Sequence, residues 1–150
     1  MKRLTTVIAV AIVTFAVLLV PGQAQAVTAS RYAQQAVHST NVHRHAHHLR
    51  TLKVGACLRK HAARQAQRMA NQHRMFHQAL KPVLRDCGLT VAGENVAYGF
   101  TTGWAVVNKG WMHSAPHRHN ILDKRFGYVG IAARRDSRGV WYVSQVLGRH

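Results

Sequence analysis

The sequence is poor in acidic residues. Only four of its 150 residues are Asp or Glu, against 21 Lys or Arg, which gives a formal net charge of +17. So few carboxylates exclude a calcium loop built from several acidic ligands. The acids are Asp86, Glu94, Asp123 and Asp136, so Glu94 is the only glutamate. Any account of function must explain where that side chain lies.

Cysteine is scarce as well. Its two copies, Cys57 and Cys87, exclude a zinc module of four thiolates. The length allows one ordinary domain, and no repeat or low-complexity linker divides the chain. We therefore expect one compact domain.

The first 26 residues have the pattern of a secretory signal. Two basic residues precede an uncharged run over residues 4–20, and a Pro-Gly pair and the small-residue motif Ala24-Gln25-Ala26 follow it directly. This pattern predicts cleavage after Ala26 and a secreted, extracellular protein. The alternative is an uncleaved membrane anchor, because the run approaches the length that spans a bilayer. The helix-breaking pair and the cleavage motif favour the signal peptide.

Export changes the interpretation of the cysteines. In an oxidising compartment the default for a single pair is a disulfide, here Cys57 to Cys87. Closing this loop stabilises the fold by roughly 3 to 4 kcal/mol on the chain-entropy estimate. The alternative is two reactive thiols, which the lack of a Cys-x-x-Cys spacing disfavours.

The hydrophobic pattern predicts helices first and strands later. Helices are expected over residues 27–49 and 56–71, and again over 102–113, where Trp104, Val107 and Trp111 fall on one face. Residues 94–100 look extended, and residues 128–133 and 140–147 read as a hairpin joined by a polar turn. This order predicts an α+β domain with helices packed on an antiparallel sheet.

The positive charge has two interpretations. It is either a solvated, self-repelling surface or an attraction to anionic cell-envelope polymers, phospholipid headgroups or polyphosphates. No aromatic platform alternates with a basic stripe, so we expect no sequence-specific binding of nucleic acid.

Histidine is unusually frequent, with 12 copies, and five fall in one stretch: His38, His43, His45, His47 and His48. On a helix, His43 with His47, or His45 with His48, could chelate a transition metal. The alternative, which we favour, is the polar face of a surface helix whose imidazoles gain charge below about pH 6.5.

A second group combines two histidines with the only glutamate. His77, Glu94 and His117 are separated in sequence, and Glu94 lies between Gly93 and Asn95. Two imidazoles and a carboxylate suit a zinc site, and they also form a general acid/base set near neutral pH. The structural alternative is that Glu94 caps backbone amides while the histidines satisfy buried polar groups.

Two motifs around these residues resemble a known family. Gly93-Glu94-Asn95-Val96-Ala97 and Trp111-x-x-Ser114-x-x-His117-Arg118-x-Asn120-Ile121-Leu122 are similar to the paired signature of the CAP superfamily, or SCP domain. Its members include cysteine-rich secretory proteins, antigen 5 and pathogenesis-related proteins, with short bacterial secreted forms. Asn41-x-x-Arg44 and Gly127-x-x-Gly130 extend the likeness. The domain is expected over residues 39–150, after an extension at 27–38 that leads into the first helix.

The resemblance implies a three-layer α-β-α sandwich with a central antiparallel sheet. It also implies a central cleft holding two histidines and two acids. His77, Glu94 and His117 match three of these positions, and Ser114 occupies the fourth, where animal members often have Glu. The expected cofactor is Zn²⁺ or another divalent metal on His77 and His117, with Glu94 orienting a ligand water. The disulfide would tie the second helix to the segment before the Gly93 strand.

Our leading hypothesis is a secreted, monomeric, non-enzymatic binding domain whose cleft takes a divalent metal or a small or lipid ligand. The alternative is an extracellular hydrolase of protease or esterase type, in which His77 or His117 activates Ser114 and Glu94 orients the histidine. Three points weigh against the hydrolase. The second cleft acid is absent, Ser114 and His117 lie three apart in a Pro-containing turn, and no oxyanion-hole motif is recognisable.

Overall fold

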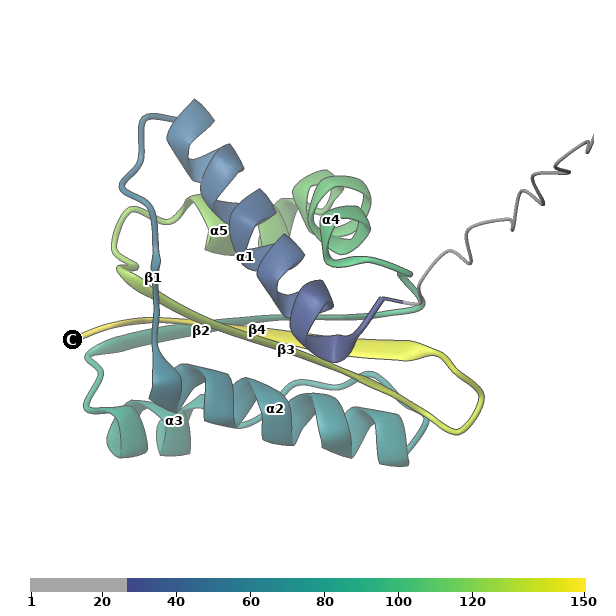
Figure 1. Cartoon of the computed structure of the whole chain (residues 1–150). Helices are drawn as coiled ribbons and strands as arrows, with labels where there is room; N and C mark the ends of the chain where they lie inside the picture. The colour runs from purple at the N-terminus through teal and green to yellow at the C-terminus, as the bar shows by residue number, and fades with distance from the viewer. Residues whose placement is uncertain (1–26) are drawn as a thin grey trace, which may run out of the picture.

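The protein has three layers, with a sheet between two layers of helices (Figure 1). The computed structural model describes residues 27–150, so the predicted signal peptide lies outside the described residues. The helical elements are α1 (Ala29–Ala46), α2 (Ala56–Asn71), α3 (Leu80–Cys87), α4 (Gly103–Ala105), η1 (Val106–Gly110), η2 (Trp111–His113) and α5 (Ala115–Leu122). The strands are β1 (Lys53–Val54), β2 (Val91–Tyr98), β3 (Tyr128–Arg135) and β4 (Trp141–Arg149).

The sheet has the strand order β1-β3-β4-β2. Its three long strands are antiparallel, as predicted, whereas the two-residue β1 pairs with β3 in parallel and makes the sheet mixed. The predicted hairpin is β3 and β4, and β2 begins at Val91, three residues before the expected start. The three-layer α+β sandwich is therefore confirmed.

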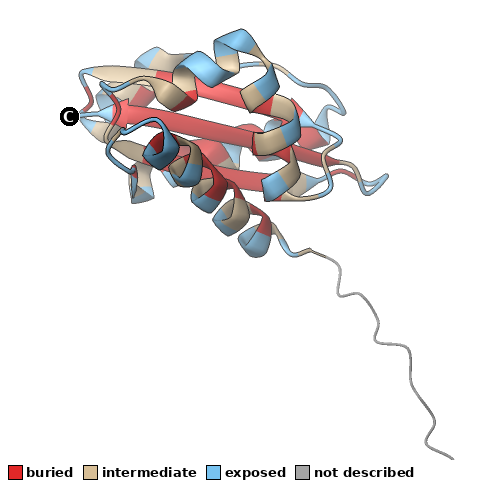
Figure 2. Cartoon of the chain, turned by 90° about the horizontal axis from the view of Figure 1, so that it is seen from above, coloured by how far each residue is buried: buried red, intermediate tan, exposed pale blue. Residues whose placement is uncertain are grey.

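The long strands of the sheet are mostly buried between the helical layers (Figure 2), and alternating residues pack on its two faces. On one face, Val129, Val143 and Leu147 pack with residues of α1, η1 and α5. On the other, Ala132 and Val146 pack against α2 and α3. Within residues 27–150 no helix combines the length and the apolar character needed to cross a membrane.

A buried arginine joins α1 to the loops at one end of the sheet. Arg44 is 1% exposed and donates to four backbone carbonyls, those of Arg50, Ile121, Asp123 and Phe126. Burial lowers the pKa of Arg44, against the opposing effect of the Asp123 carboxylate. The Asn41-x-x-Arg44 motif is thus structural, since Asn41 also exchanges two hydrogen bonds with the backbone of Leu52.

The helix expected over residues 102–113 is not continuous. It consists of one α turn, a π-helical turn (η1) and a 3₁₀ turn (η2), so the predicted face does not form. Val107 and Trp111 are buried as predicted, but Trp104 is half exposed. The physical reason is Gly103, whose missing side chain lets its backbone pack directly on α1 and turns the neighbouring Trp104 outward.

Two short helices go beyond the sequence interpretation. The Pro-containing turn expected after Ser114 is the start of α5, because proline is tolerated in the first turn of a helix, where its missing N–H has no partner to lose. Helix α3 was not predicted. A helix of eight residues is too short to be stable by itself, so the packing of Val83 stabilises it.

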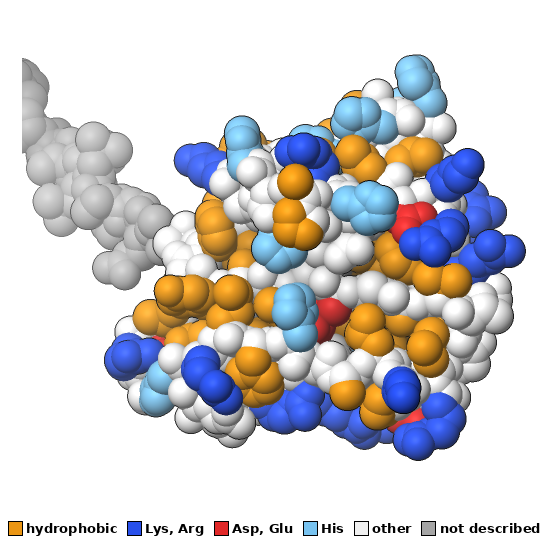
Figure 3. All heavy atoms as spheres, turned by 180° about the vertical axis from the view of Figure 1, so that it is seen from behind, with side chains coloured by type: hydrophobic (Ala, Val, Ile, Leu, Met, Phe, Trp, Pro, Cys, Tyr) orange, Lys and Arg blue, Asp and Glu red, His pale blue; other side chains and the backbone are white. Residues whose placement is uncertain are grey.

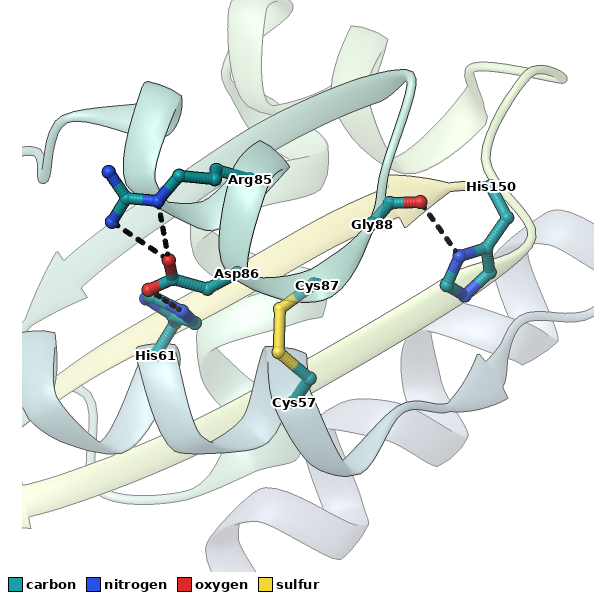
Figure 4. The surroundings of a disulfide bond; sticks show 7 residues. All are labelled: Cys57, His61, Arg85, Asp86, Cys87, Gly88 and His150. Atoms are coloured by element: carbon teal, nitrogen blue, oxygen red, sulfur yellow. Dashed lines mark hydrogen bonds and ion pairs between the residues drawn. A yellow bond between two sulfur atoms is a disulfide. The ribbon is translucent and has the colours of Figure 1, made fainter.

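The predicted disulfide is present and no free cysteine remains in the described chain (Figure 4). Cys57 in the first turn of α2 bonds Cys87 at the end of α3, with the Cα atoms 5.7 Å apart. The buried His61 ring lies beside it, 3.5 Å from the Asp86 carboxylate, which Arg85 also binds. Burial lowers the pKa of His61, and Arg64 and Lys60 lower it further, while Asp86 opposes them.

Replacing both cysteines by serine should destabilise the fold by about 3 to 4 kcal/mol, because the 30-residue sequence separation becomes an open loop in the unfolded chain. Urea denaturation measures this difference. The reductant TCEP should lower the parent to the same stability and leave the serine variant unaffected. A parent that is equally stable with and without TCEP contradicts the prediction.

The Gly127-x-x-Gly130 motif offers a second stability test. A Cβ on Gly130 would lie 2.1 Å from the Arg59 backbone nitrogen, so α2 would have to move away from β3. We expect Gly130→Ala to cost about 3 kcal/mol, at the upper end of overpacking substitutions. In the control Gly127→Ala the new Cβ meets only the flexible end of Arg50, at 3.3 Å, and the loss should stay below about 1 kcal/mol. Similar losses for the two variants would contradict this account.

Candidate functional site

A buried carboxylate holds an exposed histidine at the free edge of the sheet. The Glu94 side chain, on β2, is 2% exposed, whereas that of His77, in the loop between α2 and α3, is 59% exposed. His77 Nδ1 lies 2.9 Å from Glu94 Oε2. This contact fixes the ring and leaves Nε2 as its outward nitrogen.

The Glu94 carboxylate is fully occupied by hydrogen bonds. Oε2 pairs with His77 Nδ1 and accepts from the backbone N–H of Gln78 at 3.1 Å. Oε1 accepts from Gln78 Nε2 at 2.7 Å and from the buried Ser144 hydroxyl at 2.8 Å. Each carboxylate oxygen accepts about two hydrogen bonds, so this set uses the available lone pairs. Glu94 is therefore built to orient His77.

Sequence reasoning missed Gln78 and Ser144. One signal was available for Ser144, because Ser144-Gln145 places two polar residues in succession within an otherwise apolar strand. One of two successive strand residues must face each core, and a buried polar side chain needs a partner there. Gln78 gave no comparable signal, since a glutamine in a loop is ordinary.

His117 approaches the same edge from the opposite helical layer. It lies on α5 and is partly buried, and its backbone carbonyl accepts from Asn95 Nδ2. Burial lowers the pKa of His117, and the nearby His77 lowers it further. Figure 3 shows histidine side chains both above and below the middle of this face. We call His77, Glu94 and His117 the candidate site.

The signature asparagines join the layers around this site. Asn95 Nδ2 also donates to Gln145 Oε1, and Gln145 Nε2 donates to Thr40 on α1. Asn120 Nδ2 donates to Asn95 Oδ1 and to the backbone carbonyl of Glu94. This chain of amides crosses the sheet edge from α1 through β4 and β2 to α5.

Three more signature residues hold the segment around α5. Trp111 Nε1 donates to the Val96 carbonyl, and Arg118 Nη1 donates to the Met112 carbonyl. Gly93 is required because a Cβ there would lie 2.9 Å from the Phe126 ring. These motif residues therefore position His117 and the Glu94 strand.

Ser114 is not arranged as an activated nucleophile. It precedes α5, its backbone carbonyl accepts from the Arg118 N–H, and in the described chain its hydroxyl makes no hydrogen bond to His77 or His117. A serine nucleophile requires a base within hydrogen-bond reach. The geometry thus gives the hydrolase hypothesis no support at this residue.

The three residues of the candidate site do not form a closed cluster of metal ligands. Across residues 27–150, the one set of three or more His, Cys, Asp or Glu ligand atoms within 4.8 Å of one another is Cys57, His61 and Cys87. The disulfide occupies both cysteines of that set. At the candidate site a metal would have the two histidines as ligands, with Glu94 behind His77, because a carboxylate in that position commonly orients a ligating imidazole.

Four of the five N-terminal histidines lie in the last turn of α1 or directly after it. Helix α1 ends at Ala46, His47 is its C-cap, and His48 has a left-handed backbone with φ of 56°. His43 Nε2 is 2.7 Å from Asn108 Oδ1. The His47 N–H still donates to the His43 carbonyl, so this pair keeps its helical spacing, whereas His48 lies outside the helix.

Two hollows of the described surface lie beside α2. One, of about 820 Å³, separates α1 from α2 and has an alanine- and valine-rich lining. The other, of about 700 Å³, lies between α2 and α3 and includes Gln78. Neither hollow is lined by His77, Glu94 or His117.

Comparison with known proteins decides the family. The family model described as CAP, the cysteine-rich secretory protein family, matches residues 37–147. The chain belongs to the CAP family. A bacterial relative, the protein YkwD of Bacillus subtilis, is 32% identical over 127 residues, which cover 80% of this chain. The chain spans about half of that relative, since the match covers 48% of its length.

Solved structures share the CAP fold. An extracellular SCP-domain protein from Bacillus anthracis aligns with a TM-score of 0.69 and 25% identity, over 79% of this chain and 40% of its own. A cysteine-rich secretory protein from Staphylococcus aureus gives 0.68 and 21%, covering 81% and 39%. An outer surface protein from Borrelia burgdorferi gives 0.74 and 15%, covering 83% and 96%.

The proximity of the two site histidines can be tested by NMR. The imidazole of His117 should titrate with a pKa below 6.5, since burial and His77 both disfavour its charged form. His77→Gln should move the His117 pKa upward by removing the like charge. The control His73→Gln removes a histidine elsewhere and should leave it unchanged. If the pKa of His117 is the same in the His77 variant as in the parent, the two rings are not coupled.

Proposed function

We propose that this CAP protein is a non-enzymatic extracellular binding domain whose ligand site is the His77 and His117 pair. The observation that carries the proposal is the Glu94 carboxylate, which is buried, satisfied by its hydrogen bonds and dedicated to holding one exposed imidazole. Burying a charge is costly unless it is fully hydrogen-bonded. Here the hydrogen bonds present a fixed nitrogen to the solvent.

A divalent metal such as Zn²⁺ is the ligand that this arrangement suits best. Neutral imidazole nitrogen is a common zinc ligand, and the lowered pKa of His117 favours its neutral form. With two protein nitrogens, the other coordination positions are left for water or a small polar ligand.

Two of the structurally similar proteins support an extracellular function. The Bacillus anthracis structure is described as extracellular, and the Borrelia protein as an outer surface protein. The disulfide agrees with an oxidising compartment. The monomeric state is part of the same proposal.

Zinc calorimetry tests the site. In a background where the five histidines between residues 38 and 48 are replaced by glutamine, one equivalent of Zn²⁺ should bind. The double variant His77→Ala, His117→Ala should abolish the heat, because both protein ligands are gone. Glu94→Gln should weaken binding by about 10- to 100-fold, the usual effect of losing the group that orients a ligating histidine.

The matched control is His113→Ala, His119→Ala, which removes two exposed histidines from the same segment and should bind zinc like the parent. No heat in the parent background, or equal heat in the site and control variants, would refute zinc binding at this pair. Circular dichroism of each variant checks that the fold is retained.

A further inference from the structure

The outward face of α2 carries a row of three cations. Lys60, Arg64 and Arg68 follow one another at four-residue intervals, and all three are exposed. Four residues advance a helix by about 6 Å and by little more than one turn, so the charges form a line along the helix. We call these three residues the α2 stripe.

The positive charges of the α2 stripe are not balanced within the helix, because α2 contains no acidic residue. Within residues 27–150, none of the three residues takes part in an ion pair, and Arg68 donates to the neutral Gln65 side chain. Like charges four residues apart on a helix repel one another. An external anion would relieve this repulsion.

A hollow of about 700 Å³ runs beside the stripe, between α2 and α3. Its lining contains the whole stripe, a further cation from β3 (Arg134) and the neutral residues Ala63, Gln67, Ala79 and Pro82. Among its described lining residues the one acid is Asp86, which Arg85 and His61 already engage. Figure 3 shows Lys and Arg side chains along the lower edge of the molecule, in the layer of α2 and α3.

We propose that the α2 stripe and this hollow bind a flexible phosphodiester polymer of the cell-envelope type. Three of the four cations are arginines, whose planar guanidinium donates bidentate hydrogen bonds to phosphate. Evenly spaced charges suit a chain with regularly repeated phosphates, and the hollow has the size for a single chain rather than a duplex. This site is separate from the histidine pair.

The two sites meet at one residue. Gln78 lines the hollow and also donates to both oxygens of Glu94. The hollow therefore extends to the residue that braces the candidate site. A polymer along the stripe would hold the protein with His77 close to the anionic surface.

A synthetic glycerol phosphate oligomer of about ten repeats tests the proposal. Its affinity for the triple variant Lys60→Gln, Arg64→Gln, Arg68→Gln should fall at least about tenfold at about 0.1 M salt. The slope of log affinity against log salt should become shallower by about 2, because about three phosphate contacts are lost. Fluorescence anisotropy measures both quantities.

The charge-matched control is Arg31→Gln, Lys109→Gln, Lys124→Gln, which removes three exposed cations from the opposite layer. The affinity of this control variant for the oligomer should fall by less than about threefold, because its net charge is reduced but its stripe is intact. Equal losses in the two triple variants, or an unchanged affinity in the stripe variant, would overturn the localisation.

Three further measurements complete the test. A polyglutamate of equal charge should bind more weakly; equal affinity with the same dependence on the stripe would overturn the phosphate assignment. Thermal melting of the stripe variant should occur at or above the parental temperature because repulsion is removed, which establishes that lost binding is not lost folding. Zinc binding by the stripe variant, measured by calorimetry, should match that of the parent. If the polymer-binding proposal fails, the zinc proposal therefore still has its own test.

Discussion

The free edge of β2 is the constraint on which this structure depends. β2 is an end strand of the sheet, and an end strand exposes backbone groups that need partners. Here the Glu94 carbonyl accepts from Asn120 and the Val96 carbonyl accepts from Trp111. These two bonds bring the η2–α5 segment against the edge and place His117 there. The residues that close the sheet therefore also assemble the candidate site.

Each of the few acids in the described chain has a fixed partner. Glu94 holds His77, Asp86 contacts His61 and Arg85, and Asp123 pairs with Arg125. Asp136 is buried among donors at the β3–β4 turn. Burial alone would raise the pKa of Asp136, but hydrogen bonds from His73, Val140 and Arg138 lower it well below its usual range. With the acids engaged in this way, most of the cations face solvent without a partner, and the α2 stripe is a direct consequence.

The candidate site and the stripe use charge in opposite ways. At the sheet edge one buried carboxylate, satisfied by hydrogen bonds, fixes the orientation of the His77 imidazole. Along α2 the charges are exposed to solvent, so the proposed polymer binding would depend on salt and on the spacing of the phosphates. The disulfide connects the candidate site with the α2 stripe. It anchors α3 to the start of α2 and so holds the loop that carries His77 and Gln78. A small domain can thus present a fixed site beside an adaptable surface.

The sequence by itself determined the layers of the fold and the choice of candidate site residues. Its two periodicities predicted α1, α2 and the β3–β4 hairpin, and the signature motifs predicted the CAP fold and placed Glu94 with His77 and His117. Only the tertiary structure decided how those residues are held. Gln78 and Ser144 saturate Glu94 from two different elements, and no spacing in the chain encodes that encounter. The exposure of Trp104 was equally beyond the pattern, since it follows from the contact of Gly103 with the α1 backbone. Local periodicity records which face of an element is apolar, whereas hydrogen-bond partners and backbone contacts depend on how distant elements meet.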